Sequence, residues 1–173
     1  MIMQIYANKG MFIESLVEKT ISYYIDNNIC FLEKRHIPIK IIKNKGNNLI
    51  EGKLLNKSYV DYMGIINGKF ITFETKQTNE NVFYVNQLKD HQFNHLQLIN
   101  KFKGISFLVI HFYKFDKTFL LSYSTIENIF MSKIKKISLE YLTENIDNEK
   151  IFILDIVFPG ILNIFDVVNK MDK

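Results

Sequence analysis

The sequence predicts an α/β domain in which a mixed central sheet is flanked by helices. The pair Asn67-Gly68 lies between two runs rich in apolar residues, and Asn-Gly is the dipeptide most typical of a two-residue hairpin turn. Apolar residues recur at helical spacing over residues 10–28, and a second helical pattern follows the hairpin. The 173 residues are 47% hydrophobic and include 15 Phe and 9 Tyr, which suffices for one core. We therefore expect a single domain over residues 1–173.

The composition favours an anionic partner inside the cell. The net charge is +4 and the isoelectric point about 9.0. Arg35 is the single arginine, and the wealth of Lys, Asn and Ile leaves open that an AT-rich genome produced the basic balance. Cys30 is the only cysteine, so no intrachain disulfide can form and a reducing compartment is expected. Residues 1–10 lack a signal-peptide pattern and no apolar run is long enough for a membrane span, so we expect a cytoplasmic protein without a membrane partner.

Residues 10–28 form the first expected helix, with Ile13 and Val17 on its apolar side. Glu14 and Glu18 lie one helical turn apart beside that side. Two solvated glutamates are the plainer interpretation. The functional interpretation is that Glu14 adds a carboxylate to a metal site built elsewhere in the fold. A short strand is expected over residues 29–33.

Residues 34–58 are strongly basic and long for a connection within a compact domain. Aliphatic residues between the charges argue against disorder. We therefore expect a projecting hairpin, the stalk, that lies on a phosphate backbone, with a solvated charged loop as the alternative. Against the single acid Glu51, the stretch carries the basic residues Lys34, Arg35, Lys40, Lys43, Lys45, Lys53 and Lys57.

The hairpin over residues 58–78 is where we expect chemistry. If Asn67-Gly68 is the whole loop, Asp61 lies directly opposite Glu74. Side chains alternate along a strand, so Glu74 and Lys76 share a face, which Asp61 joins. Carboxylates this close repel each other unless a cation lies nearby, and Mg²⁺ or Mn²⁺ prefers carboxylate oxygen. The alternative is a surface ion pair on an edge strand, but apolar residues on both faces argue for a central strand.

The segment after the hairpin predicts a helix from Asn86 to about residue 103. His91 and Gln92 are expected to point toward the carboxylates, where they would contact DNA. His91 and His95 could chelate a metal, but no third imidazole or thiol is near, so a zinc site is not expected. The apolar side of this helix is expected to comprise Leu88, His95, Leu96, Ile99 and Phe102.

The remaining residues predict strands and short helices in alternation. Strands are expected over residues 105–113 and 118–123, followed by a short helix over residues 125–131. Ser138 is expected to start another short helix. A late strand over residues 151–158 follows. Pro159-Gly160 is then expected to open a C-terminal helix over residues 161–171.

The order Asp61, then Glu74-x-Lys76 on the next strand, resembles the core of the PD-(D/E)xK nucleases. A longer ordered set of residues runs over nearly the whole length: Lys9-Gly10-Met11, Glu14, Tyr23-Tyr24, Pro38, Asp61-Tyr62, Gly64-Ile65, Gly68, Phe73-Glu74-Thr75-Lys76, Asp90-His91-Gln92 and His95. With these residues the chain resembles the RecU-type Holliday junction resolvases of Gram-positive bacteria and mollicutes. The sequence departs from these patterns at Val60, Met63 and Gly160.

The resemblance implies a restriction-endonuclease-like sheet and a homodimer that binds four-way junction DNA and nicks two symmetric strands. Asp61 and Glu74 would hold Mg²⁺ or Mn²⁺, Glu14 would complete the site, and Lys76 would stabilise charge on the phosphate. The stalks would enter the junction centre. Recombination or branch-migration proteins are further candidate partners. Two alternatives stay open, namely another PD-(D/E)xK DNA endonuclease and a catalytically weakened junction-binding protein.

Overall fold

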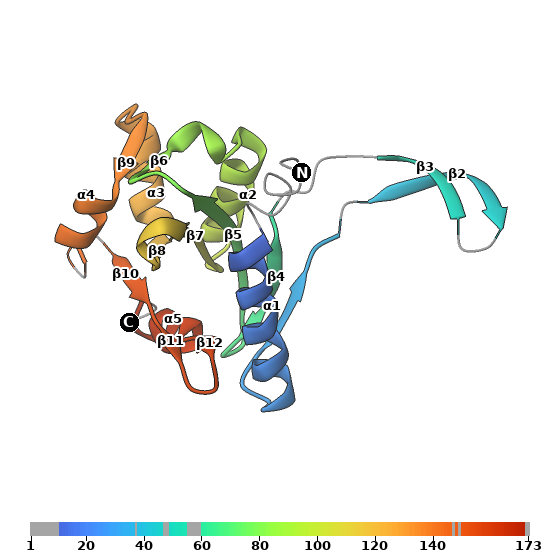
Figure 1. The fold of residues 1–173 in the computed structure, drawn as a ribbon, viewed down its shortest axis with the longest axis horizontal. Coiled ribbons are helices and arrows are strands. Elements are labelled where there is room, and N and C mark those ends of the chain that lie inside the picture. The colour runs from blue at the N-terminus through green and yellow to red at the C-terminus, as the bar shows by residue number, and fades with distance from the viewer. Residues whose placement is uncertain are drawn as a thin grey trace, which may run out of the picture.

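A six-stranded mixed sheet forms the centre of the molecule (Figure 1). The computed structural model describes residues 11–36, 38–46, 49–54, 60–146, 148 and 150–171, and for Met11, Leu49 and Leu54 only the backbone. β5 and β7 run parallel, and every other neighbouring pair is antiparallel. In spatial order the strands are β1 (Phe31–Lys34), β4 (Tyr62–Ile66), β5 (Lys69–Thr78), β7 (Ile105–Phe112), β8 (Lys117–Ser122) and β10 (Ile151–Leu154).

The hairpin of β4 and β5 has the predicted register. Ile66 pairs with Lys69 across the Asn67-Gly68 turn, and the pairing continues to the start of β4. Asn67 and Gly68 have φ values of 50° and 74°, the positive angles that a type I′ turn requires. β5 lies between β4 and β7, so the interpretation of an edge strand is wrong and the expected central strand is confirmed.

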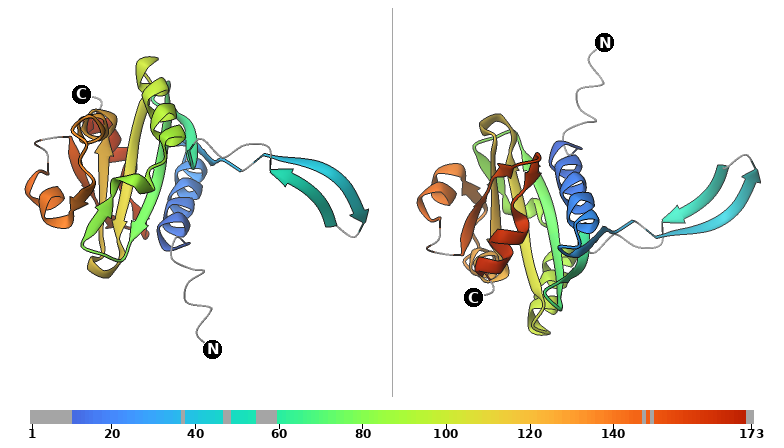
Figure 2. Two further views of the ribbon diagram at one scale, coloured as in Figure 1. Left: turned by 90° about the horizontal axis from the view of Figure 1, so that it is seen from above. Right: turned by 90° about the horizontal axis from the view of Figure 1, so that it is seen from below.

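Helices cover the sheet through two separate apolar clusters. Helices α1 (Met11–Asp26) and α5 (Ile164–Met171) pack on the cluster that contains the stacked rings of Tyr62, Phe73 and Phe107. Helices α2 (Asp90–Lys101), α3 (Tyr123–Met131) and α4 (Leu139–Glu144) pack on the other cluster. Figure 2 shows α1 lying along the sheet in both views. Among the described residues, no helix is long and apolar enough to cross a membrane.

The helix after the hairpin begins later than predicted. Strand β6 (Val82–Tyr84), which pairs with β9 (Lys136–Ser138), and the short 3-10 helix η1 (Val85–Gln87) precede it. Helix α2 starts at Asp90 because the Gln92 side chain accepts from the backbone N–H of Lys89 and caps that end. Phe102 was predicted to face the core but is 80% exposed, since it follows the last helical turn.

The prediction that Pro159-Gly160 opens the last helix is wrong. These residues form the turn between β11 (Ile156–Val157) and β12 (Ile161–Leu162), where the backbone N–H of Gly160 donates to Val157. Helix α5 begins at Ile164, after the turn hairpin has closed. The predicted helix start at Ser138 is confirmed, since its hydroxyl accepts from the backbone N–H of Tyr141.

A second hairpin, β2 (Ile39–Gly46) with β3 (Leu49–Leu54), forms a sheet of its own. It extends away from the central sheet in all three views (Figures 1 and 2). Its described side chains are exposed on both faces, among them Ile41 and Ile42. The chain therefore presents an extended arm whose side chains do not contribute to the described core.

Candidate active site

Asp61 and Glu74 lie together where β4 begins. Asp61 directly precedes β4, and its backbone N–H donates to Oε2 of Glu74 at 3.1 Å. Glu74 lies within β5 and is only 1% exposed, although a carboxylate is costly to bury. The predicted juxtaposition therefore places one carboxyl group in the interior and a second beside it.

Burial is the main reason that the pKa of Glu74 rises from 4.5 to about 7, and the charge of Asp61 raises it further. Lys76 opposes this rise, because its ammonium lies 2.5 Å from Oε1 of Glu74. The Lys76 side chain is 21% exposed, so this ion pair is partly shielded from water. One ammonium offsets only part of the charge of two carboxylates, which leaves the site favourable for a further cation.

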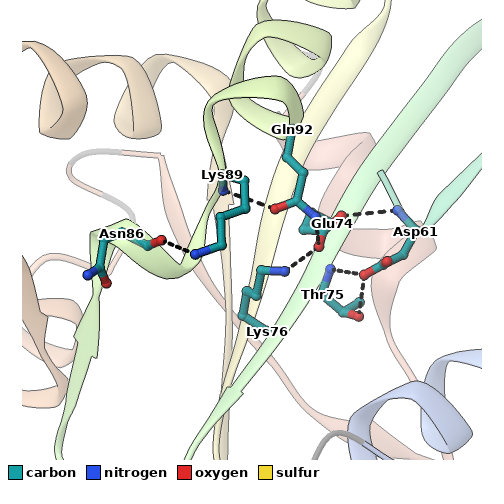
Figure 3. A network of polar contacts seen from close by, with 7 residues as sticks. All are labelled: Asp61, Glu74, Thr75, Lys76, Asn86, Lys89 and Gln92. Carbon is teal, nitrogen blue, oxygen red and sulfur yellow. Dashed lines mark hydrogen bonds and ion pairs between the residues drawn. The ribbon is translucent and has the colours of Figure 1, made fainter. Parts of the chain in front are cut away.

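Gln92 of α2 holds Glu74 from the neighbouring layer (Figure 3). Its Nε2 donates to Oε1 of Glu74 at 2.5 Å, while its own Oε1 accepts from the backbone N–H of Lys89 at 3.0 Å. The Lys89 ammonium in turn donates to the carbonyl of Asn86 at 2.9 Å. The start of α2 is thus connected to the carboxylates by side-chain hydrogen bonds, as sequence analysis expected for Gln92 but not for Lys89 or Asn86.

Thr75 also belongs to the site, although sequence analysis did not assign it a role. Its backbone N–H and its hydroxyl both donate to Oδ2 of Asp61 at 3.1 Å. Alternation along β5 directs Thr75 away from the face of Glu74, so no face-based pattern could have identified it. Asp61 can reach it because β4 begins only at Tyr62, which leaves the preceding residue free of the strand alternation.

The carboxylates of α1 approach the same region from the other side of the sheet. Glu14 and Glu18 both bind the ammonium of Lys34, at 2.9 and 2.5 Å. Burial first, and then the charges of Glu18, Glu14, Asp61 and Glu74 in that order, raise the pKa of Tyr62. The charges of the α1 carboxylates and of the strand carboxylates therefore act on the same buried hydroxyl group, while Glu14 itself is bound by Lys34.

The other predicted site residues are distributed over the molecule. Arg35 is half-buried, and its backbone N–H donates to the carbonyl of Asp61 at 2.7 Å. His91 is half-buried in the first turn of α2. Burial and the charge of Arg35 lower the pKa of His95 below its usual value, which favours the neutral imidazole. Lys57 lies outside the described residues.

The basic side chains of the β2–β3 hairpin are well separated from these carboxylates in sequence and structure. Lys40, Lys43 and Lys53 are exposed. Lys45 pairs with Glu51 at 2.9 Å, and both side chains are more than half exposed. Three of the four described lysines of this hairpin therefore lie outside that ion pair and add exposed positive charge to the arm.

The donor set suits a hard divalent cation. Asp61 and Glu74 offer carboxylate oxygens, which Mg²⁺ and Mn²⁺ prefer. Among the described residues, no group of three His, Cys, Asp or Glu side chains is placed to hold a metal. Mg²⁺ typically keeps several waters and binds through one or two carboxylates, so this pair meets the requirement.

Gln92→Leu should destabilise the fold, because it removes the donor to Glu74 and the cap acceptor of α2 together. Losing two partly buried hydrogen bonds should cost about 1–3 kcal/mol of unfolding free energy. In a chain of this length that lowers the melting temperature by roughly 2–12 °C, which thermal denaturation in EDTA would measure. Asn94→Leu, on the exposed side of the same helix, is the matched control. Equal melting of the two variants would refute this role for Gln92.

Comparison with known proteins gives a consistent result over nearly the whole chain. The sequence profile of the family described as "Recombination protein U", RecU, matches residues 8–170. Among similar proteins, the "Holliday junction resolvase RecU" of Ureaplasma parvum is 36% identical over 95% of this chain and 94% of its own. The proteins of the same name from Mycoplasmopsis pulmonis and Staphylococcus saprophyticus are 32% and 28% identical, over 95% and 96% of this chain and 96% and 82% of theirs.

Proposed function

Because the chain belongs to the RecU family, we propose that it is a Holliday junction resolvase, an endonuclease that nicks symmetric strands of four-way DNA junctions in recombination and repair. The observation that carries this proposal is the pair of carboxylates on the β4–β5 hairpin with Lys76 beside them. The central parallel pair β5–β7 with antiparallel neighbours also supports a restriction-endonuclease-like domain over the whole chain.

Asp61 and Glu74 would hold Mg²⁺ or Mn²⁺, which supplies activated water and polarises the scissile phosphate. Gln92 and Thr75 keep the two carboxylates in place through the hydrogen bonds that they donate. Lys76 would place its positive charge against the phosphate, where negative charge increases during the reaction. Glu14 would join this site from α1, where it now pairs with the Lys34 ammonium that Glu18 also binds.

The β2–β3 hairpin would bind the phosphate backbone as the stalk of this proposal. Its lysines are exposed and are not needed for the core. Their ammonium groups can therefore pair with phosphates and release the counterions of the DNA. Symmetric nicking requires two active sites related by a two-fold axis, so the proposed enzyme acts as a homodimer, with one stalk from each subunit. The proposed enzyme would act in the cytoplasm during DNA recombination, together with branch-migration proteins.

The decisive experiment is cleavage of a synthetic four-way junction in Mg²⁺ or Mn²⁺, beside a linear duplex of the same sequence. We expect paired nicks in the junction, dependent on the metal, and little cleavage of the linear duplex. Equal digestion of both substrates would favour a general endonuclease. Junction binding without nicking, at high protein concentration and in Mn²⁺, would favour a catalytically weakened junction-binding protein.

Metal binding should depend on pH through Glu74. Its pKa of about 7 in the folded chain lies above the ordinary 4.5, so the folded state holds the proton more tightly than the unfolded state. Metal-free stability should therefore fall as pH rises from about 4.5 to 7, relative to Glu74→Gln. A cation binds only the ionised carboxylate, so Mn²⁺ should raise the melting temperature more at pH 8 than at pH 6. If Mn²⁺ raises the melting temperature of Glu74→Gln as much as that of the parent chain, the ion binds elsewhere.

A further inference from the structure

A groove opens beside the candidate active site and shares Lys89 with its hydrogen-bond network. Its volume is about 690 Å³, and its walls include Tyr84, Asn86, Lys89, Phe130, Lys133 and Lys135. These residues come from β6, from η1 and the residues after it, and from the end of α3 and the loop that follows. We refer to it below as the Lys89 groove.

The charge of the Lys89 groove suits an anionic ligand. Lys89, Lys133 and Lys135 are all exposed, and Asp90 is the one acidic residue in its lining. Lys136 adds a further ammonium on the neighbouring strand, where it pairs across β6 and β9 with Tyr84. The groove therefore combines several exposed cations along its lining, as a surface that follows a phosphate backbone does.

The apolar part of the groove includes two aromatic rings beside aliphatic side chains. Tyr84 is 47% exposed although its ring is large. Phe130 stacks on Phe93, with ring centroids 4.1 Å apart, so its position is fixed by the core. Exposed rings among lysines are typical of surfaces that bind single-stranded nucleic acid, because unpaired bases stack on the rings while the cations hold the phosphates. A duplex keeps its bases stacked internally and would leave Tyr84 unused.

The groove lies next to the position proposed for the scissile phosphate. Lys89 lines the groove, and its backbone N–H binds the side chain of Gln92, which binds Glu74. Figure 3 shows Lys76 between Glu74 and the segment from Asn86 to Lys89. A DNA strand held at the carboxylates can thus continue past Lys76 into the groove.

We propose that the Lys89 groove binds a short unpaired stretch of the DNA strand next to the scissile phosphate, with one base stacked on Tyr84. This inference rests on the proposed function, because the strand reaches the groove from that active site. It adds a subsite for single-stranded DNA that is distinct from the β2–β3 hairpin. Opening the end of a junction arm would then be part of substrate binding.

The test measures binding of a fluorescent oligo(dT) of about 12 nucleotides by anisotropy, in EDTA so that the DNA stays intact. The full-length chain is compared with Tyr84→Ala/Lys135→Ala, and the exposed pair Tyr113→Ala/Lys114→Ala is the matched control. Loss of one stacking ring and one ammonium should weaken oligo(dT) binding roughly 10- to 100-fold. Tyr84→Phe keeps the ring and should bind as the parent does. Melting temperatures establish that all variants fold.

Three results would overturn the subsite. The first is parental oligo(dT) binding by Tyr84→Ala/Lys135→Ala, and the second is an equal loss with the control pair. A loss of linear-duplex binding as large as that of oligo(dT) binding would also overturn it, because the groove would then hold a duplex backbone. Cleavage of a four-way junction by the parent chain, beside a linear duplex, is measured separately. Failure of the resolvase proposal would appear in that cleavage assay, and failure of the subsite only in the binding measurements on the variants.

Discussion

Asp61→Asn should lower junction cleavage by roughly 10²–10⁴-fold, because it removes a ligand charge from a metal site worth several kcal/mol to the reaction. Asparagine retains the size of the side chain and an oxygen that can accept from Thr75, so the fold should persist. Junction affinity should survive or rise, since a negative charge near the phosphates is lost while the stalk is unchanged. Cleavage rates under single-turnover conditions and binding in EDTA measure the two effects.

The opposite effects on cleavage and binding separate chemistry from misfolding. A folding defect would lower both, whereas loss of the metal ligand lowers cleavage alone. Asp155→Asn removes an equal charge from an exposed position outside the site and should leave both at the parental level. Lys76→Ala should also lose cleavage but should weaken binding slightly, because it removes a positive charge. If Asp61→Asn folds and nicks junctions at the parental rate in Mg²⁺, the assignment of Asp61 is wrong.

The core of the site could be predicted because a two-residue turn fixes the register of its hairpin. Once Asn67-Gly68 is the loop, the pairing of Tyr62 with Phe73 follows from counting along the two strands. That pairing brings the preceding Asp61 to Glu74. The faces of Glu74 and Lys76 follow from alternation. Both constraints depend only on residues close together in the chain, so they can be predicted from a single sequence.

Contacts made by residues outside regular strands could not be predicted in the same way. Thr75 binds Asp61 because Asp61 lies just before β4, and no periodic pattern describes such a residue. The start of α2 was placed too early because Asn86 continues a helical pattern that η1 interrupts. Sequence analysis predicted a DNA contact for Lys34 but not its ion pairs with the two glutamates of α1. These ion pairs join two different elements, α1 and β1, so only the folded structure reveals them.

Replacing Lys40, Lys43 and Lys53 together with Ala should weaken junction binding roughly 10- to 100-fold near 0.1 M salt, if each contacts a phosphate. The plot of log affinity against log salt should become shallower by up to about 0.9 per lost contact. Lys45 is left out of this set, because its ammonium already pairs with Glu51 at 2.9 Å. All three lysines are exposed, so the melting temperature should hardly change.

A charge-preserving variant decides whether these lysines act through charge. Arginine at the same three positions keeps the positive charge at each of them and should restore both the affinity and the salt slope. Lys45→Ala alone should change the slope little, because it also releases Glu51 from its ion pair. Parental affinity together with an unchanged salt slope in the triple alanine variant would leave the basic stretch as a consequence of codon bias. The loss of affinity without a change in slope would instead place the effect in the shape of the hairpin rather than in phosphate contacts.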